Sequence, residues 1–170
     1  MVTPDLSRRV ACLGLAAFFG LGTAPARADN PVDLDWSDLV PEGEVGLPPA
    51  LQGLVEHGAA PLASLQPPSS GVRTDWNGQT VRLSGFIVPL DFSGTGLTAF
   101  LLVPYVGACV HVPPPPPNQL VLVTTERPYE SDGLFEAVTV TGMFGSASSS
   151  TQLAEVGYAL SADRIRPYRG

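Results

Sequence analysis

Residues 79–90 read Gln-Thr-Val-Arg-Leu-Ser-Gly-Phe-Ile-Val-Pro-Leu, and this stretch decides the fold class. Its first half alternates between apolar Val81 and Leu83 and polar neighbours such as Arg82. Alternation with a period of two is typical of a strand that buries one face. Gly85 interrupts the pattern, and the apolar residues after it take the other parity. We therefore expect a strand over residues 79–90 with a bulge or a sharp coil at Gly85.

Four further segments have strand-like patterns. A turn at residues 91–96 leads into residues 97–106, a nearly continuous apolar run of the kind that is buried on both faces. The other three strand-like segments are residues 119–125, 137–144 and 158–165. One helical turn near Thr151–Val156 separates the last two. The pattern predicts a mainly β fold, a small five-stranded OB-like (oligonucleotide/oligosaccharide-binding) barrel with one or two short helices; a β-sandwich is the alternative.

The first 28 residues have the pattern of a signal peptide. Arg8 and Arg9 precede an apolar run from Val10 to Thr23, and Ala26-Arg27-Ala28 supplies the small-x-small cleavage pattern. The run is shorter than the roughly 20 apolar residues that a membrane-spanning helix needs. We therefore expect cleavage after Ala28 and a soluble periplasmic protein.

Behind the signal peptide, composition divides the chain into two parts. Residues 29–70 form an acidic, proline-rich arm with a short helix expected over residues 49–57, and residues 71–170 form the barrel domain. The apolar side chains expected to dock the arm on the barrel are Trp36, Leu39 and Val40.

The charge of the chain excludes one class of partner. The formal charge is −7, and removal of residues 1–28 takes away three arginines and one aspartate, which leaves −9. Every basic residue is arginine. Because so acidic a chain repels phosphate backbones, we do not expect it to bind nucleic acid.

The stretch Tyr105-Val-Gly-Ala-Cys-Val-His-Val-Pro-Pro-Pro-Pro-Pro-Asn-Gln119 has the most unusual composition. With Cys12 lost in the signal peptide, Cys109 has no partner for an internal disulfide. A lone thiol in an oxidising compartment is buried, bound to a metal, or paired with another molecule.

Cys109 and His111 are the candidate metal ligands. In an extended chain, residues two apart point to one face, with α-carbons roughly 6.6 Å apart, so both side chains would reach one zinc ion. Two ligands do not complete a tetrahedral site, and no third is identified. A buried thiol beside a histidine that bonds to backbone carbonyls is the structural alternative. A nucleophilic thiol activated by the imidazole is the enzymatic alternative.

The five prolines predict a polyproline II rod, about 15 Å long at roughly 3.1 Å per residue. Because prolines donate no backbone hydrogen bonds, we expect the rod at a sheet edge or across a barrel mouth. It would act as an exposed strap between strands or as a preformed ridge for a partner. The candidate partner-binding residues are Tyr105, Pro113, Pro114, Pro115, Pro116, Pro117, Asn118 and Gln119.

Three motifs together resemble a known family. They are Leu34–Pro41, Val81–Leu90 and the stretch from Phe100 to Gln119. The chain resembles the bacterial exported family known as domain of unknown function 3299. The resemblance implies a role beside ABC-type envelope transport components and in metal homeostasis, with zinc as the implied metal.

Three functions follow from these observations. The first is a non-enzymatic periplasmic module that binds a transition metal or assists an envelope transport system. The second is a thiol-dependent redox enzyme that uses Cys109, although no C-x-x-C motif or resolving cysteine accompanies it. The third is a purely structural interaction domain. We expect a protein that is not an enzyme.

Overall fold

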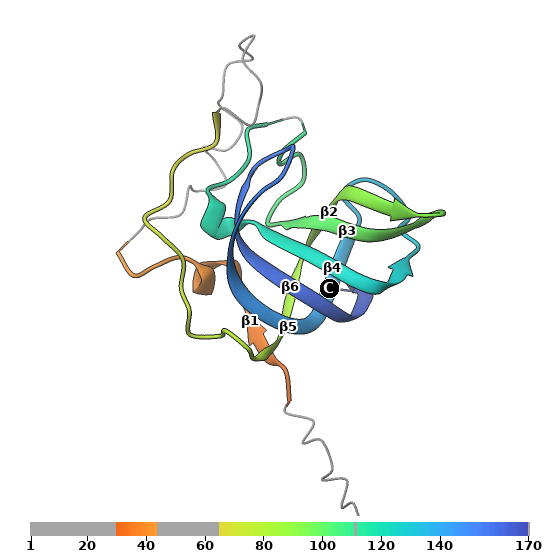
Figure 1. The fold of residues 1–170 in the computed structure, drawn as a ribbon, viewed down its shortest axis with the longest axis horizontal. Helices are drawn as coiled ribbons and strands as arrows, with labels where there is room; N and C mark the ends of the chain where they lie inside the picture. Colours follow the sequence, from red (N-terminus) through yellow and green to blue (C-terminus); the bar gives the residue numbers. More distant parts are fainter. Residues whose placement is uncertain (1–29, 44–64, 111, 170) are drawn as a thin grey trace, which may run out of the picture.

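The computed structural model describes residues 30–43, 65–110 and 112–169, and most of them belong to one barrel (Figure 1). Its strands are β2 (Thr80–Ser93), β3 (Gly96–Val103), β4 (Val121–Tyr129), β5 (Ala137–Ser150) and β6 (Glu155–Pro167). All five expected strands are present, and most extend beyond the ranges that the sequence pattern gave. The sequence patterns located the centres of the strands, because burial alternates there. They missed the strand ends, where the strands stay paired but their side chains are exposed to solvent.

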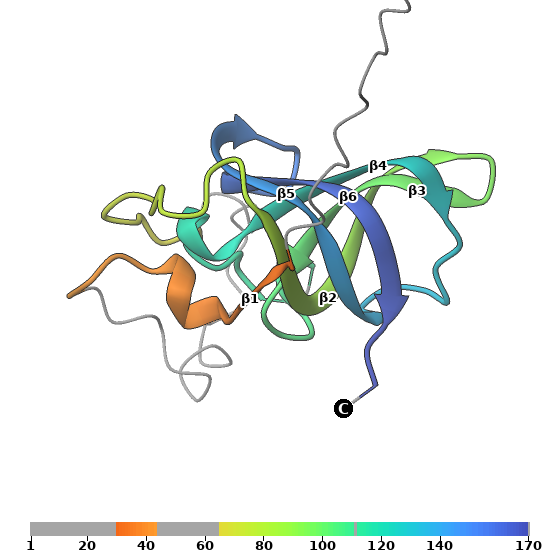
Figure 2. The same ribbon diagram turned by 90° about the horizontal axis from the view of Figure 1, so that it is seen from below.

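The sheet closes on itself, as Figure 2 shows from below. Around the barrel the order is β2-β3-β4-β6-β5, and β5 returns to pair with β2. Every barrel pairing is antiparallel except that of β4 with β6. This order is that of an OB-type barrel, which confirms the predicted class, and closure excludes the β-sandwich.

The acidic arm adds a sixth strand. β1 (Val32–Leu34) pairs in parallel with β2, and the 3-10 helix η1 (Trp36–Leu39) follows it. The indole nitrogen of Trp36 donates a 2.8 Å hydrogen bond to the carbonyl of Ser84, and Leu39 is fully buried. Docking of the arm through Trp36 and Leu39 is therefore confirmed, whereas its pairing as a strand was not expected.

The barrel interior is an apolar core built from alternate residues of all five strands. Its large, fully buried members include Tyr158, Phe100, Leu83, Ile87, Leu97, Leu102 and Leu160. Phe144 stacks on Tyr158, with ring centroids 5.1 Å apart. Burial of these side chains on one face of each strand is the main stabilising contribution to the fold.

Gly85 has a different role from the expected bulge. The pairing register of β2 runs through Gly85 without a shift, and the irregularity falls between Pro89 and Phe92. A β-carbon at Gly85 would lie 2.8 Å from the carbonyl oxygen of Val103 and 2.9 Å from the ring of Trp36. Glycine is required here because the backbone of β3 and the arm approach closely.

The change of parity after Gly85 marks a second apolar cluster, which lies on the outside of the barrel. We call it the outer apolar layer. Its buried members are Val88, Leu101, Val103, Ala108, Cys109, Leu120, Ala154 and Val156. Because β2 and β3 contact apolar side chains on both faces here, their sequences read as nearly continuous apolar runs.

The helical turn expected near Thr151–Val156 is absent. Thr151–Val156 forms a tight hairpin turn and the start of β6, because the Thr151 hydroxyl accepts hydrogen bonds from the amides of Leu153 and Ala154. The helix expected at residues 49–57 lies outside the described residues. The two described helices are short 3-10 turns, η1 and η4 (Pro117–Gln119). None of the described helices is long and apolar enough to cross a membrane.

Candidate functional site

Cys109 lies in a tight turn between β3 and β4. The Gly107 carbonyl accepts hydrogen bonds from the amides of Val110, at 3.3 Å, and Val112, at 3.2 Å. Cys109 itself has a φ of 65°, in the left-handed region. The extended conformation assumed for the Cys109–His111 pair therefore does not hold at Cys109.

The thiol of Cys109 is a buried group of the outer apolar layer. Cys109 is 4% exposed, and desolvation raises its pKa to about 12. A thiol with this pKa is protonated at neutral pH, whereas a metal ligand or a nucleophile is a thiolate. Among the described residues no group of three or more His, Cys, Asp or Glu side chains is placed to hold a metal. His111 and His57 lie outside them, so the zinc hypothesis stays a prediction.

The polyproline segment is buried, not an exposed strap. Pro114, Pro115, Pro116 and Asn118 are buried, and Tyr105 and the other expected partner-binding residues are half-buried. Burial raises the pKa of the Tyr105 phenol to about 12. Prolines have no amide hydrogen to satisfy, so this segment is buried without the usual cost of an unpaired donor.

Gln66 fastens the polyproline segment to β6. Its side-chain amide donates to the carbonyls of Pro115, at 2.9 Å, and Glu155, at 2.8 Å, and it accepts from the Glu155 amide at 2.8 Å. The segment is thus part of the packed structure, and its role in binding a partner stays a prediction.

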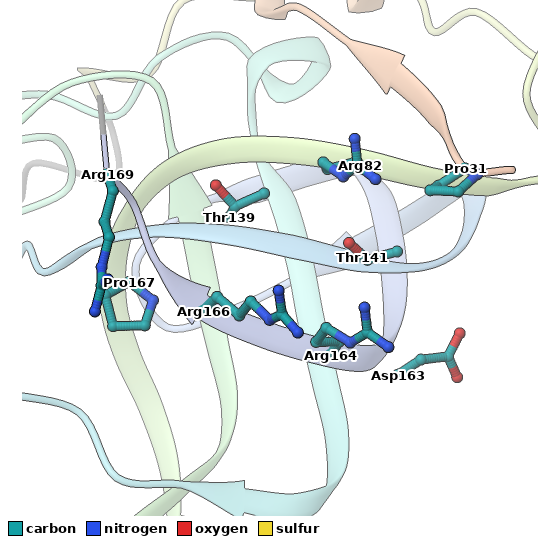
Figure 3. Close-up of a pocket in the computed structure, with 9 residues that line it drawn as sticks. All are labelled: Pro31, Arg82, Thr139, Thr141, Asp163, Arg164, Arg166, Pro167 and Arg169. Atoms are coloured by element: carbon teal, nitrogen blue, oxygen red, sulfur yellow. The ribbon is translucent and has the colours of Figure 1, made fainter.

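A groove of about 860 Å³ lies on the outside of β2, β5 and β6 (Figure 3). Its volume lies within the roughly 300–1,000 Å³ typical of small-molecule sites. The residues that line it are Pro31, Arg82, Thr139, Thr141, Asp163, Arg164, Arg166, Pro167 and Arg169. Figure 3 shows the two threonines between Arg82 and the arginines of β6.

Strand register brings these side chains together. Thr141 on β5 pairs with Arg82 on β2 and with Arg164 on β6, so these three form one row across the sheet. Thr139 pairs with Arg166 in the next row. Neighbouring strands lie about 4.8 Å apart. Arg82 and Arg164 each lie one strand spacing from Thr141, on opposite sides of it.

A β-bulge shapes one end of the groove. The register between β5 and β6 shifts after the pair of Thr141 and Arg164, and Asp163 is the extra residue. A bulge re-aims side chains, and Asp163 and Arg164 both line the groove although they are adjacent in sequence. Gly142 lies opposite, where a β-carbon would stand 2.0 Å from the carbonyl oxygen of Ser161.

The groove is strongly cationic in an acidic protein. Four of the six arginines in the described ranges line it, with one aspartate, although the whole chain carries −7. Arg82 donates to Asp33 at 2.7 Å. Within the described part of the chain, Arg164, Arg166 and Arg169 form no ion pair. Three neighbouring arginines without an ion-pair partner among the described residues favour the binding of an anion.

Sequence reasoning missed this groove. It placed Arg82 on the outward face of the first strand but did not align that face with Arg164 and Arg166. The available signal was the pair of arginines on either side of Ile165, which points to one polar face of that strand. The register of β5 with both β2 and β6 is needed to bring this face beside Arg82.

Comparison with known proteins identifies the family. Residues 36–167 match the family described as protein of unknown function (DUF3299). The chain belongs to this family. It is also similar to a DUF3299 family protein from Pseudomonas aeruginosa PAO1, whose crystal structure was determined at 2.45 Å resolution. The two are 37% identical, the match covers 84% of this chain and 99% of the other, and the TM-score is 0.74. No similar sequence was found among curated proteins.

Proposed function

We propose that this DUF3299 protein is a non-enzymatic binding module that recognises oxyanion groups in the groove of β2, β5 and β6. The observation that carries the proposal is the gathering of Arg82, Arg164, Arg166 and Arg169 in one groove of an acidic chain. Of these four, Arg82 pairs with Asp33, whereas the other three form no ion pair with the residues that the structure describes.

The side-chain chemistry of the groove fits phosphate or carboxylate. A guanidinium donates two parallel N–H groups to two oxygens of one anion, and it stays charged at every physiological pH. The hydroxyl of Thr141, between Arg82 and Arg164, adds an uncharged donor at the centre of the row.

Binding rather than catalysis is the proposed role. Arginine does not exchange its proton near neutral pH, and an unactivated threonine is a poor nucleophile. The described residues that line the groove include no histidine, cysteine or lysine. They also include no aromatic ring on which a nucleobase would stack, so a small anion is favoured over single-stranded nucleic acid.

We place this function in the periplasm. The support is the signal-peptide pattern of residues 1–28, with cleavage after Ala28. Mass spectrometry of the protein recovered from a periplasmic extract tests the location. We expect the mass of a chain that begins at Asp29. A chain with an intact N-terminus in the cytoplasmic fraction would contradict the proposal.

NMR titration of the purified, isotope-labelled protein with inorganic phosphate tests the binding function. We expect saturable shifts in the backbone amides of Thr139–Thr141 and Arg164–Arg166. The amides of Ala108–Val110, which belong to the outer apolar layer, serve as the internal control and should not move. The absence of saturable shifts at millimolar phosphate, or equal shifts in both regions, would overturn the proposal.

A further inference from the structure

We infer that the ligand of the groove carries two acidic oxyanion groups, one for each of the two cross-strand rows. This inference rests on the proposed anion-binding function and adds the class of ligand. It follows from the register of β2, β5 and β6, from the bulge at Asp163 and from the positions of the unpaired arginines.

The first row holds one oxyanion group. Arg82 and Arg164 lie on either side of Thr141 in the strand register, and all three side chains line the groove. Arg82 uses one terminal nitrogen to bind Asp33, and its other N–H groups remain as donors. Asp33 also fixes where the Arg82 side chain lies.

The second row holds another group. Arg166 pairs with Thr139, whose hydroxyl shares a 2.8 Å hydrogen bond with that of Ser84. Either hydroxyl can donate in this pair. When Ser84 donates, the Thr139 hydroxyl keeps its own proton to donate to a ligand, so Thr139 and Arg166 together supply a hydroxyl and a guanidinium.

The spacing of the rows sets the size of the ligand. Thr139 and Thr141 are two residues apart on β5, which corresponds to about 6.8 Å along an antiparallel strand. One phosphate or carboxylate group can reach both rows only by using part of the donors of each, although each row offers a hydroxyl and a guanidinium of its own. A ligand with two acidic groups separated by a short linker contacts both at once, and the second contact gains from the effective concentration that the first creates.

The two ends of the groove differ in charge, which gives the ligand a direction. Asp163 lies at the end beside Arg164, and Arg169 lies at the opposite end, beyond Arg166 (Figure 3). The Asp163 carboxylate lies beyond the first row, so it disfavours any acidic group placed past Arg164. The favourable placement therefore runs from the row of Arg164 to the row of Arg166 and toward Arg169.

Isothermal titration calorimetry at low ionic strength tests the two-row arrangement. The probes are propane-1,3-bisphosphonate against methylphosphonate, and glutarate against acetate, so that each doubly acidic molecule has a singly acidic counterpart. We expect the bisphosphonate to bind at least about tenfold more tightly than methylphosphonate, a difference of about 1.4 kcal/mol. Comparison of the bisphosphonate affinity with the glutarate affinity also shows whether phosphonate or carboxylate is preferred.

Matched variants separate the rows. Arg166→Gln should bring the ratio of the two phosphonate affinities down to about twofold, the statistical advantage of a ligand with two equal groups. Arg164→Gln should weaken both phosphonates. Arg127→Gln removes the same charge from the exposed surface of β4, outside the groove, and should leave the ratio unchanged.

The outcomes distinguish this inference from the function on which it rests. If both phosphonates bind with equal affinity to the unmodified protein, the groove has one anion position and the inference is wrong, while the binding function stands. If Arg127→Gln lowers the ratio as much as Arg166→Gln, the preference is a general charge effect and the inference is also wrong. If none of the four probes binds, the binding function itself fails.

Discussion

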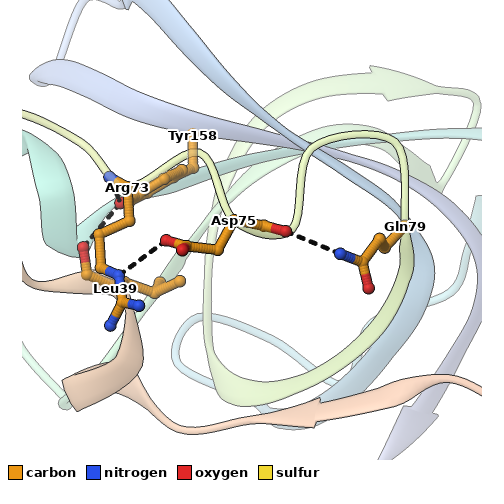
Figure 4. A network of polar contacts seen from close by, with 5 residues as sticks. All are labelled: Leu39, Arg73, Asp75, Gln79 and Tyr158. Atoms are coloured by element: carbon orange, nitrogen blue, oxygen red, sulfur yellow. Dashed lines mark hydrogen bonds and ion pairs between the residues drawn. The ribbon is translucent and has the colours of Figure 1, made fainter.

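The hydroxyl of Tyr158 donates a 2.6 Å hydrogen bond to the carbonyl of Leu39 and accepts a 2.7 Å hydrogen bond from the amide of Arg73 (Figure 4). A single buried atom of β6 therefore fastens both the acidic arm and the segment that leads into β2. Removal of the Tyr158 hydroxyl deprives the buried carbonyl of Leu39 and the amide of Arg73 of this hydrogen-bond partner.

We predict that Tyr158→Phe lowers the free energy of unfolding by about 1–3 kcal/mol, because the buried carbonyl of Leu39 loses its donor. Urea denaturation monitored by circular dichroism measures the change. Tyr168→Phe is the matched control, since that side chain is 54% exposed, and it should change stability by less than about 0.5 kcal/mol. Equal effects of the two substitutions would show that the Tyr158 hydroxyl holds nothing in place.

The raised pKa of Cys109 predicts a specific loss of stability in alkali. The unfolded thiol ionises near its ordinary pKa, whereas burial holds the folded thiol protonated up to about 12. Between these values the unfolded state binds fewer protons, so stability falls as pH rises, by at most about 1.4 kcal/mol per pH unit. Comparing Cys109→Ala with the unmodified protein isolates this contribution from that of Tyr105.

Below the ordinary pKa of the thiol, the difference in stability between Cys109→Ala and the unmodified protein should not vary with pH, and above it the difference should shrink.

Metal analysis of the same preparations tests the zinc hypothesis for Cys109 and His111. If Cys109 is only a core residue, as its burial indicates, the protein contains much less than one zinc per chain. Stoichiometric zinc that Cys109→Ala abolishes would contradict this account of the cysteine.

Gly142 links the fold to the groove. A β-carbon there would stand 2.0 Å from the carbonyl oxygen of Ser161, so Gly142→Ala must displace the bulge that presents Asp163 and Arg164. We predict a loss of about 1–3 kcal/mol in stability together with weaker anion binding. Gly145→Ala on the same strand is the control, because the nearest atom lies 3.9 Å from its added β-carbon. A stable Gly142→Ala protein with unchanged anion affinity would refute the role of the bulge.

The buried polyproline segment predicts a different sensitivity for two prolines. Pro115→Gly and Pro68→Gly both add freedom to the unfolded chain, worth about 0.4–1 kcal/mol. Only Pro115 is buried, so its substitution should also lose packing and cost clearly more. Thermal unfolding of the two variants measures the difference. Equal melting temperatures would mean that the segment is a surface connector after all.

Much of the fold follows from local patterns in the sequence. The alternation of Val81 and Leu83 located β2, and five such segments with short connections were enough for a barrel. The sequence pattern led to a wrong prediction at Gly85, where a bulge was expected. Strand periodicity cannot show whether the second apolar face of a strand packs against another part of the same chain. Here Val88 and Cys109 meet in an outer layer that only the three-dimensional arrangement reveals.

The groove was less accessible to sequence reasoning than the core. Arg82 and Arg164 are far apart in the sequence, and they meet only through their common partner Thr141. A register shifted by one residue would turn these side chains to the other face. Rare residue types drew attention to Cys109 instead, although its environment is that of a core residue.

The affinity for inorganic phosphate, measured by calorimetry at low ionic strength, tests the central claim most directly. We predict that Arg164→Gln weakens binding about tenfold or more, as expected for the loss of a charge-assisted hydrogen bond, whereas Arg127→Gln changes it less than about twofold. Both variants remove one positive charge from an exposed position, so their general electrostatic effects match. Equal weakening by the two substitutions, or no measurable binding by the unmodified protein, would contradict the account.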